Sequence, residues 1–190
     1  MSTRPDICYP VGYLGRFQQQ PGQQHWVSLK RVVRYLQGSK NLVLTLKRSA
    51  NAQPLVGFAD ADWASDTTDR KSVSGYLFQV FGNTVSWSSK KQTTVATSSS
   101  EAEYVALSAA AAEAIWLSGL LDDLGLKTVK PVPIFEDNRG CIGMEKNLES
   151  KRAKHIGIKH HFVRDHIATG DLTVKSIPTL EQLADIHYPS

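Results

Sequence analysis

The stretch Gly57-Phe58-Ala59-Asp60-Ala61-Asp62-Trp63 carries the strongest structural signal in the chain, because an apolar run over 54–59 leads there into closely spaced aspartates. Side chains alternate along a strand, so Asp60 and Asp62 share a face if the strand extends that far. An unpaired carboxylate is costly to bury, so an acid at the end of a buried strand needs a partner. A divalent cation is one such partner. The alternative is that both aspartates, which favour turns, open a polar turn before Trp63.

The composition is that of one globular domain, or of one domain with an appendage. The chain has 190 residues, 41% of them apolar and 21% charged, which argues against a disordered protein. No apolar run approaches the ~20 residues of a membrane-spanning helix, so we expect no membrane, and the N-terminus lacks the apolar segment of a signal peptide. Cys8 and Cys141 are far apart, which indicates reduced thiols in an intracellular protein and excludes a cysteine-rich zinc module.

The positive charge is concentrated at the start of the chain. Residues 1–50 hold eight Lys or Arg and one acid, a net charge of +7 in a chain of net charge +4, so the remainder is acidic. A basic arm of this kind attracts polyphosphates such as nucleic acids. The alternative is a solvated face beside a larger partner.

The first 50 residues are predicted to form a small segment of their own. Residues 1–22 contain three prolines and a Gln run, which predicts an extended or irregular stretch. A helix is predicted over 24–37 from four apolar residues at helical spacing, Trp26, Leu29, Val33 and Leu36. A short strand is predicted over 41–46. A polar break at 49–53 then separates segment 1–50 from a main domain at 53–190.

The main domain reads as three strands, a long helix, a fourth strand, two helices, a fifth strand and a last helix. Their predicted ranges are 55–60, 73–81, 84–89, 98–124, 130–135, 139–146, 157–168, 172–176 and 178–185. Gly82-Asn83 predicts a hairpin between the second and third strands. A meander followed by helix–strand units predicts an α/β fold, a mixed five-stranded sheet flanked by helices.

Acidic residues are expected to meet at one edge of this sheet. The fourth strand follows a helical crossover, so it can lie parallel to the first and bring Asp137 beside Asp60. Open α/β sheets place their sites at this carboxyl edge. Glu103, one turn into the long helix, can reach the same edge, as can Asp185 if the last helix docks there.

Several stretches resemble the ribonuclease H region of Pol polyproteins from copia-type LTR retrotransposons. They include Phe-Ala-Asp-Ala-Asp-Trp-Ala (58–64), Ser-Ser-Ser-Glu-Ala-Glu-Tyr-Val-Ala-Leu (98–107), Glu-Asp-Asn (136–138) and Glu-Gln-Leu-Ala-Asp (181–185). Residues 69–76, 85–96, 154–156 and 160–165 continue the resemblance. Residues 4–9, 14–17 and 25–38 resemble the connection segment between reverse transcriptase and its ribonuclease H. The ordered succession of motifs covers nearly the whole chain.

The resemblance implies a ribonuclease H-like fold and a metal-dependent endoribonuclease that hydrolyses the RNA strand of RNA–DNA hybrids during reverse transcription. It implies two Mg²⁺ ions, replaceable by Mn²⁺, on Asp60, Glu103, Asp137 and Asp185, and Mg²⁺ does prefer such oxygen ligands. The reverse transcriptase domain of the same polyprotein is the implied partner. The implied location is intracellular, in a cytoplasmic virus-like particle or the nucleus.

Three neighbouring acids compete with the implied ligands. Asp62 competes with Asp60, although the family places the ligand directly after Phe-Ala. Glu101 competes with Glu103, and its place in the first helical turn suits an acid that interacts with the helix dipole. Asp165 competes with Asp185 and can instead form a surface ion pair.

Basic side chains are predicted to contact the nucleic acid phosphates, or else to line a solvated edge; they are Arg70, Lys71, Lys90, Lys91, Lys154 and His155. His155 can shuttle protons or help release product, and a solvated loop histidine is the alternative. His160, His161 and His166 form no zinc-ligand quartet with it. Trp87 and Trp116 are expected in the core.

One departure from the family pattern concerns the end of the chain. The family continues past Ala-Asp with an apolar helix, whereas Asp185 is followed here by five residues. A helix this short frays, so Asp185 is expected to be loosely held. The alternative function is therefore a degraded or domesticated remnant, without catalysis, that binds nucleic acid or a polymerase partner.

Overall fold

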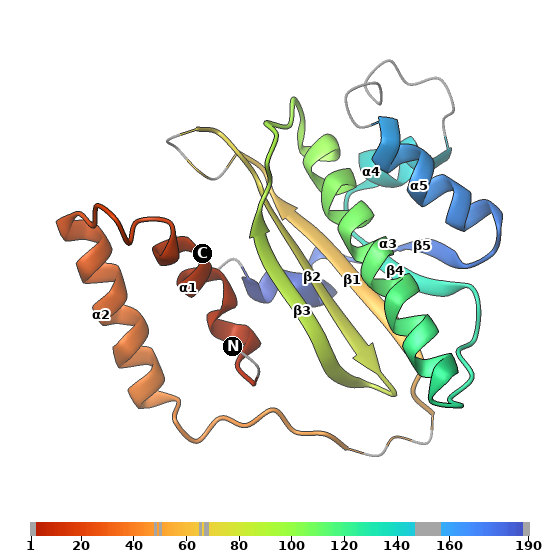
Figure 1. Cartoon of the computed structure of the whole chain (residues 1–190), viewed down its shortest axis with the longest axis horizontal. Helices are drawn as coiled ribbons and strands as arrows, with labels where there is room; N and C mark the ends of the chain where they lie inside the picture. Colours follow the sequence, from red (N-terminus) through yellow and green to blue (C-terminus); the bar gives the residue numbers. More distant parts are fainter. Residues whose placement is uncertain are drawn as a thin grey trace.

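The centre of the molecule is a five-stranded mixed sheet with the strand order β3-β2-β1-β4-β5 (Figure 1). The computed structural model describes residues 3–47, 49, 51–64, 66, 69–146 and 157–187. The strands are β1 (Leu55–Asp62), β2 (Val73–Val80), β3 (Asn83–Lys91), β4 (Val132–Glu136) and β5 (Leu172–Ser176). The first three pair antiparallel, whereas β4 runs parallel to both β1 and β5. The predicted α/β fold and mixed sheet are confirmed.

Two local features explain how the meander forms. The β2–β3 turn uses Phe81 and Gly82, whose φ angles of 48° and 76° lie in the left-handed region that glycine adopts freely. Within β1, a Cβ atom on Gly57 would lie 2.4 Å from Cε1 of Phe78, so only glycine leaves room for that ring. The Phe78 side chain is thereby fully buried against β1.

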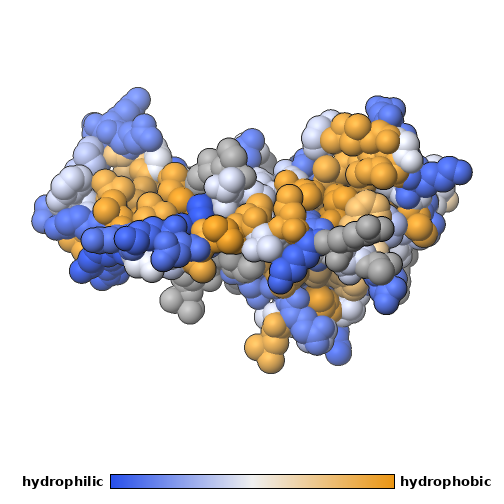
Figure 2. Space-filling model, turned by 90° about the horizontal axis from the view of Figure 1, so that it is seen from below, coloured by the Kyte–Doolittle hydropathy of each residue, from blue (hydrophilic) through white to orange (hydrophobic). Residues whose placement is uncertain are grey.

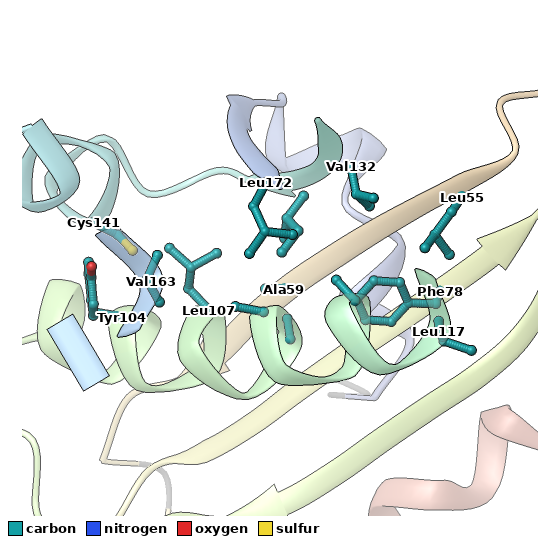
Figure 3. Close-up of a cluster of buried hydrophobic side chains, with 14 of the residues drawn as sticks. Leu55, Ala59, Phe78, Tyr104, Leu107, Leu117, Val132, Cys141, Val163 and Leu172 are labelled. Atoms are coloured by element: carbon teal, nitrogen blue, oxygen red, sulfur yellow. The ribbon is translucent and has the colours of Figure 1, made fainter. Parts of the chain in front are cut away.

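Helix α3 (Ser99–Asp123) lies across one face of the sheet (Figure 1). Its N-cap is Ser98, whose side chain accepts a hydrogen bond from the N–H of Glu101. Small buried residues such as Ala110 and Ala114 let the helix approach the strands closely. Figure 3 shows Leu107 and Leu117 of α3 beside Ala59 and Phe78 of the sheet. The core therefore lies between α3 and the strands.

By length and hydropathy, α3 is also the one helix in the described ranges that is apolar enough to cross a membrane. Composition alone therefore does not exclude a membrane span, contrary to our expectation. In this structure 61% of the apolar window of α3 is buried inside the molecule, because it packs on the sheet.

The remaining helices of the main domain cover both faces. Helices α4 (Arg139–Lys146) and α5 (Gly157–Ala168) flank α3, and their bounds match the predicted ranges. Two 3-10 helices, η3 (Thr179–Glu181) and η4 (Leu183–His187), replace the predicted last α-helix on the other face. The helix is interrupted because Gln182 takes an extended conformation, and its side-chain amide donates to the carbonyl of Ala59 at 2.8 Å.

The N-terminal segment differs most from the prediction. The stretch expected to be irregular contains the 3-10 helix η1 (Pro5–Ile7) and helix α1 (Cys8–Gly15), because proline is tolerated in a first turn. Helix α1 packs against β3, and α2 (Gln23–Gly38) packs on α1. The strand predicted over 41–46 does not form, although Asn83 of β3 bonds to both the N–H and the carbonyl of Lys47. The boundary near residue 50 stays a prediction.

Candidate metal centre

Three acidic side chains from separate elements converge at the carboxyl edge of the sheet. Asp60 lies in β1, Glu103 in α3 and Asp137 directly after β4. Each offers a carboxylate oxygen, and these oxygens lie within 4.8 Å of one another. Separations of this order allow one or two divalent cations to be shared between the carboxylates.

The register of the sheet and the phase of the helix explain this convergence. Gly57 pairs with Ile134 in the parallel ladder between β1 and β4, so the acids that follow in each strand lie at the same edge. The N-cap at Ser98 sets the rotation of α3, which turns Glu103 toward the strands and buries it to 7% exposure.

Asp185 and Thr179 complete the site from the opposite face of the sheet. Both line an open hollow of about 460 Å³, and the hydroxyl of Thr179 donates to Oδ2 of Asp137 at 2.6 Å. The full lining of this hollow is Asp60, Ala61, Asp62, Glu103, Asp137, Asn138, Thr179 and Asp185. The structure thus brings the predicted ligands into one hollow.

Burial and mutual repulsion shift the acids of this hollow toward their protonated forms. Burial is the largest cause of the raised pKa of Asp60, about 8, followed by the charges of Asp185 and Asp137. Burial likewise raises the pKa of Glu103 to about 10, with the charge of Glu136 next in size. The pKa of Asp185 is raised as well, chiefly by burial. The ionised state of these clustered carboxyl groups is therefore unfavourable unless a positive charge lies among them.

Glu136 is a buried acid whose charge acts on Glu103 from beside the hollow, and the sequence did not indicate it. It is fully buried, its Oε1 accepts from the N–H of Asn138, and burial raises its pKa well above the usual value. Within the described part of the chain, the buried Oε2 atoms of Glu136 and Glu103 have no hydrogen-bond partner. Unpartnered buried carboxylate oxygens are the donor atoms that a hard divalent cation requires, so this residue set fits Mg²⁺ or Mn²⁺.

The competing acids occupy different environments. Asp62 is half-buried and lines the same hollow. Glu101 instead accepts hydrogen bonds from the N–H and hydroxyl of Thr97, at 2.7 and 2.6 Å, so it caps the start of α3. Asp165 lies exposed on α5 and does not line the hollow.

The basic side chains predicted to contact nucleic acid lie in different environments. Lys91 pairs with Asp66 and Asp69 at 2.5 and 2.9 Å, and Lys71 pairs with Asp69 at 3.9 Å, so these lysines already have carboxylate partners. Arg70 and Lys90 are exposed. Lys154 and His155 lie outside the described residues.

The tryptophans correct one expectation. Trp116 is 59% exposed on the outer side of α3 rather than in the core, because the helix buries only the face that meets the sheet. Trp87 is half-buried in β3.

No protein-family model matches the chain, but known proteins do. The Pol polyprotein from transposon RE1 of Arabidopsis thaliana is 41% identical over 184 residues, which is 96% of this chain and 12% of that protein. The Secreted RxLR effector protein 161 of Plasmopara viticola is 53% identical over 116 residues, 61% of this chain and 81% of that protein.

The chain belongs to the Pol polyprotein family of copia-type retrotransposons. It spans about an eighth of the length of the polyproteins that it matches, 12% for the RE1 polyprotein and 14% for that of transposon TNT 1-94 of Nicotiana tabacum.

Solved structures show that this retrotransposon Pol segment has the ribonuclease H fold. LC11-RNase H1, isolated from compost, matches with a TM-score of 0.53 and 18% identity over 71% of this chain and 92% of that chain. The same enzyme in complex with an RNA/DNA hybrid matches with a TM-score of 0.51 over 69% of this chain and 91% of that chain. At this level of identity the similarity establishes the fold alone.

Proposed function

We propose that this retrotransposon Pol segment is a ribonuclease H that hydrolyses the RNA strand of RNA–DNA hybrids with two divalent metal ions. The observation that carries the proposal is the convergence of Asp60, Glu103 and Asp137 within 4.8 Å at the carboxyl edge of a ribonuclease H fold. That a related fold binds an RNA/DNA hybrid supports the same substrate class here.

In this proposal, Asp60, Glu103, Asp137 and Asp185 hold the ions, Mg²⁺ or Mn²⁺. When bound, such ions activate an attacking water and stabilise the leaving oxygen of a phosphodiester. Thr179 orients Asp137 through its 2.6 Å hydrogen bond. Glu136 accepts the N–H of Asn138 and thereby holds the turn that follows β4. The preference for RNA comes from contacts to the 2′-hydroxyl and from hybrid shape, since these distinguish RNA from DNA.

The reverse transcriptase region of the same polyprotein is the proposed partner. A hollow of about 300 Å³ between α1 and α2 has apolar walls that include Leu14, Phe17 and Trp26. Trp26 is 55% and Val33 56% exposed, and Figure 2 shows hydrophobic side chains gathered over this end of the molecule. Exposed apolar surface of this kind marks a contact site. The proposed site of action is intracellular, in a virus-like particle or the nucleus.

The test is cleavage of an end-labelled RNA–DNA hybrid with Mg²⁺ or Mn²⁺. Asp60→Asn or Asp137→Asn should abolish cleavage and leave the circular dichroism spectrum unchanged, because the amide keeps the shape but removes the charge that holds the metal. EDTA should have the same effect.

Neighbouring acids provide matched controls. Asp62→Asn, Glu101→Gln and Asp165→Asn should each retain cleavage, because the proposed ligands remain in place. Metal-dependent cleavage that survives Asp60→Asn and Asp137→Asn would overturn the assignment. Binding of the hybrid with no cleavage by the unaltered chain would instead favour the non-catalytic remnant.

A further inference from the structure

A second hollow lies beside the candidate metal centre and has different chemistry. It has a volume of about 400 Å³ and is lined by Trp63, Ala64, Arg70, Val95 and Ala96. Asp62 lines the first hollow and Trp63, the next residue, lines the second. Ala96 packs with Ala61 of β1 and with Ala102 of α3, the helix that carries Glu103. The two hollows therefore share the end of β1 and the start of α3.

Trp63 lines this second hollow with a partly exposed indole. Its side chain is 50% exposed, and its Nε1–H donates to the carbonyl of Ala96 at 3.4 Å. The following residue, Ala64, has a left-handed φ of 51° and donates its N–H to the hydroxyl of Ser72 at 3.0 Å. The Nε1–H hydrogen bond joins the indole to Ala96, which lines the same hollow.

Arg70 supplies a positive charge on the same rim. Its backbone has a φ of 57° and its N–H donates to the carbonyl of Asp66 at 2.7 Å. Among the residues that the structure describes, no carboxylate pairs with its guanidinium, whereas nearby Lys91 is bound to Asp66 and Asp69. A free guanidinium can bind phosphate through two parallel hydrogen bonds.

We propose that this second hollow binds one nucleotide of the hybrid next to the metal centre, with Trp63 against its sugar and base and Arg70 on its phosphate. This inference rests on the proposed function. Without bound metal, the acids of the first hollow offer a phosphodiester no favourable charge, so the guanidinium of Arg70 on the adjoining rim supplies a phosphate contact. Contacts to an aromatic face tolerate any base, as an enzyme without sequence preference requires.

The test is the affinity for a fluorescein-labelled RNA–DNA hybrid, measured by anisotropy in EDTA so that no cleavage occurs. Trp63→Ala should raise Kd about tenfold, the usual loss for an aromatic contact to nucleic acid. Trp63→Phe, which keeps an aromatic face, should remain within about threefold. Trp116→Ala is the matched control because that side chain is exposed to a similar degree, at 59%, but lies on α3 and outside this hollow, and its Kd should not change.

The role of Arg70 is tested by the salt dependence of hybrid binding. Arg70→Ala should weaken binding and lower the slope of log affinity against log salt by about one, since one phosphate contact is lost.

A fluorescence experiment keeps the inference testable if Trp63→Ala does not fold. Hybrid should quench part of the tryptophan emission of the unaltered chain. The Trp116→Phe chain should retain this quenching and the Trp63→Phe chain should lose it.

The outcomes separate the inference from the proposed function. Equal Kd values for Trp63→Ala and Trp116→Ala, with the unaltered chain binding and cleaving hybrid, would overturn only the nucleotide site. Failure of the unaltered chain to bind hybrid in EDTA, together with no cleavage in Mg²⁺ or Mn²⁺, would overturn both.

Discussion

Asp60 and Glu103 show how a functional site can oppose the stability of the fold that holds it. Both are buried among like charges, and their pKa values are raised to about 8 and about 10. The folded chain without metal therefore retains protons that the unfolded chain releases near pH 4. Buried acids arranged in this way are typical of sites evolved for a charged ligand.

The pH dependence of stability follows from the direction of these shifts. Because the pKa of Asp60 is raised in the folded chain, the contribution of its protonated form to stability is complete below about pH 4. That contribution is lost as the pH rises toward about 8. The free energy of unfolding in EDTA should fall by up to about 1.4 kcal/mol per pH unit for each such group. Urea unfolding between pH 4 and 8 measures it.

Asp60→Asn is the control for this pH dependence, because the amide does not titrate. In EDTA, the free energy of unfolding of Asp60→Asn should change less steeply with pH than that of the unaltered chain. Added Mg²⁺ should reduce the pH dependence of the unaltered chain only. A stability that rises between pH 4 and 8 in EDTA would contradict the raised pKa values.

Gly57 is a second residue whose role is set by a single close contact. Gly57→Ala places a methyl group 2.4 Å from the ring of Phe78, so the ring or the strand must shift. We expect a loss of about 1–3 kcal/mol in the free energy of unfolding, as for other overpacked cores. Gly119→Ala in α3, where a Cβ meets nothing within 4 Å, should instead be neutral or stabilising. Similar unfolding midpoints for the two variants would refute this explanation.

At the scale of elements, the N-cap of α3 stabilises the helix that carries Glu103. Ser98→Ala removes the side chain that accepts from the N–H of Glu101 and should lower stability by about 1 kcal/mol. Ser99→Ala, one residue into the helix and exposed, should have little effect. Thermal unfolding of the two variants decides which serine caps the helix, and a larger loss for Ser99→Ala would reassign the cap.

Some elements were predicted well because their signals are local. The strands and helices of 53–190 follow alternation, helical periodicity and turn residues, and α4, α5 and β5 have the predicted bounds. The stretch 41–46 has the apolar pattern of a strand but forms no backbone ladder with the sheet, and Leu42, Val43 and Leu46 stay exposed. A strand needs a neighbour, which the local sequence does not specify.

At the scale of the whole molecule, the N-terminal segment contacts the main domain through η1 against η4 and α1 against β3. Arg16 at the end of α1 pairs with Asp66 at 3.3 Å, and α1 packs on β3. The connection over 42–47 has no helix or strand. Limited trypsin digestion should therefore cut first after Lys47 and leave a resistant main domain.

Mass spectrometry identifies the first cut, and the circular dichroism of the resistant fragment shows whether it remains folded. Loss of structure on that single cut would contradict the predicted boundary between 1–50 and 53–190.

The sequence by itself determined the order of the elements and the placement of acids at the ends of two strands, because strand alternation and turn chemistry act over a few residues. Only the tertiary structure decided that Glu136 faces the buried side beneath α3, that Trp116 faces solvent, and that the last helix breaks at Gln182. Each of these depends on which face another element covers. That information lies in the packing of distant segments, so no local pattern could supply it.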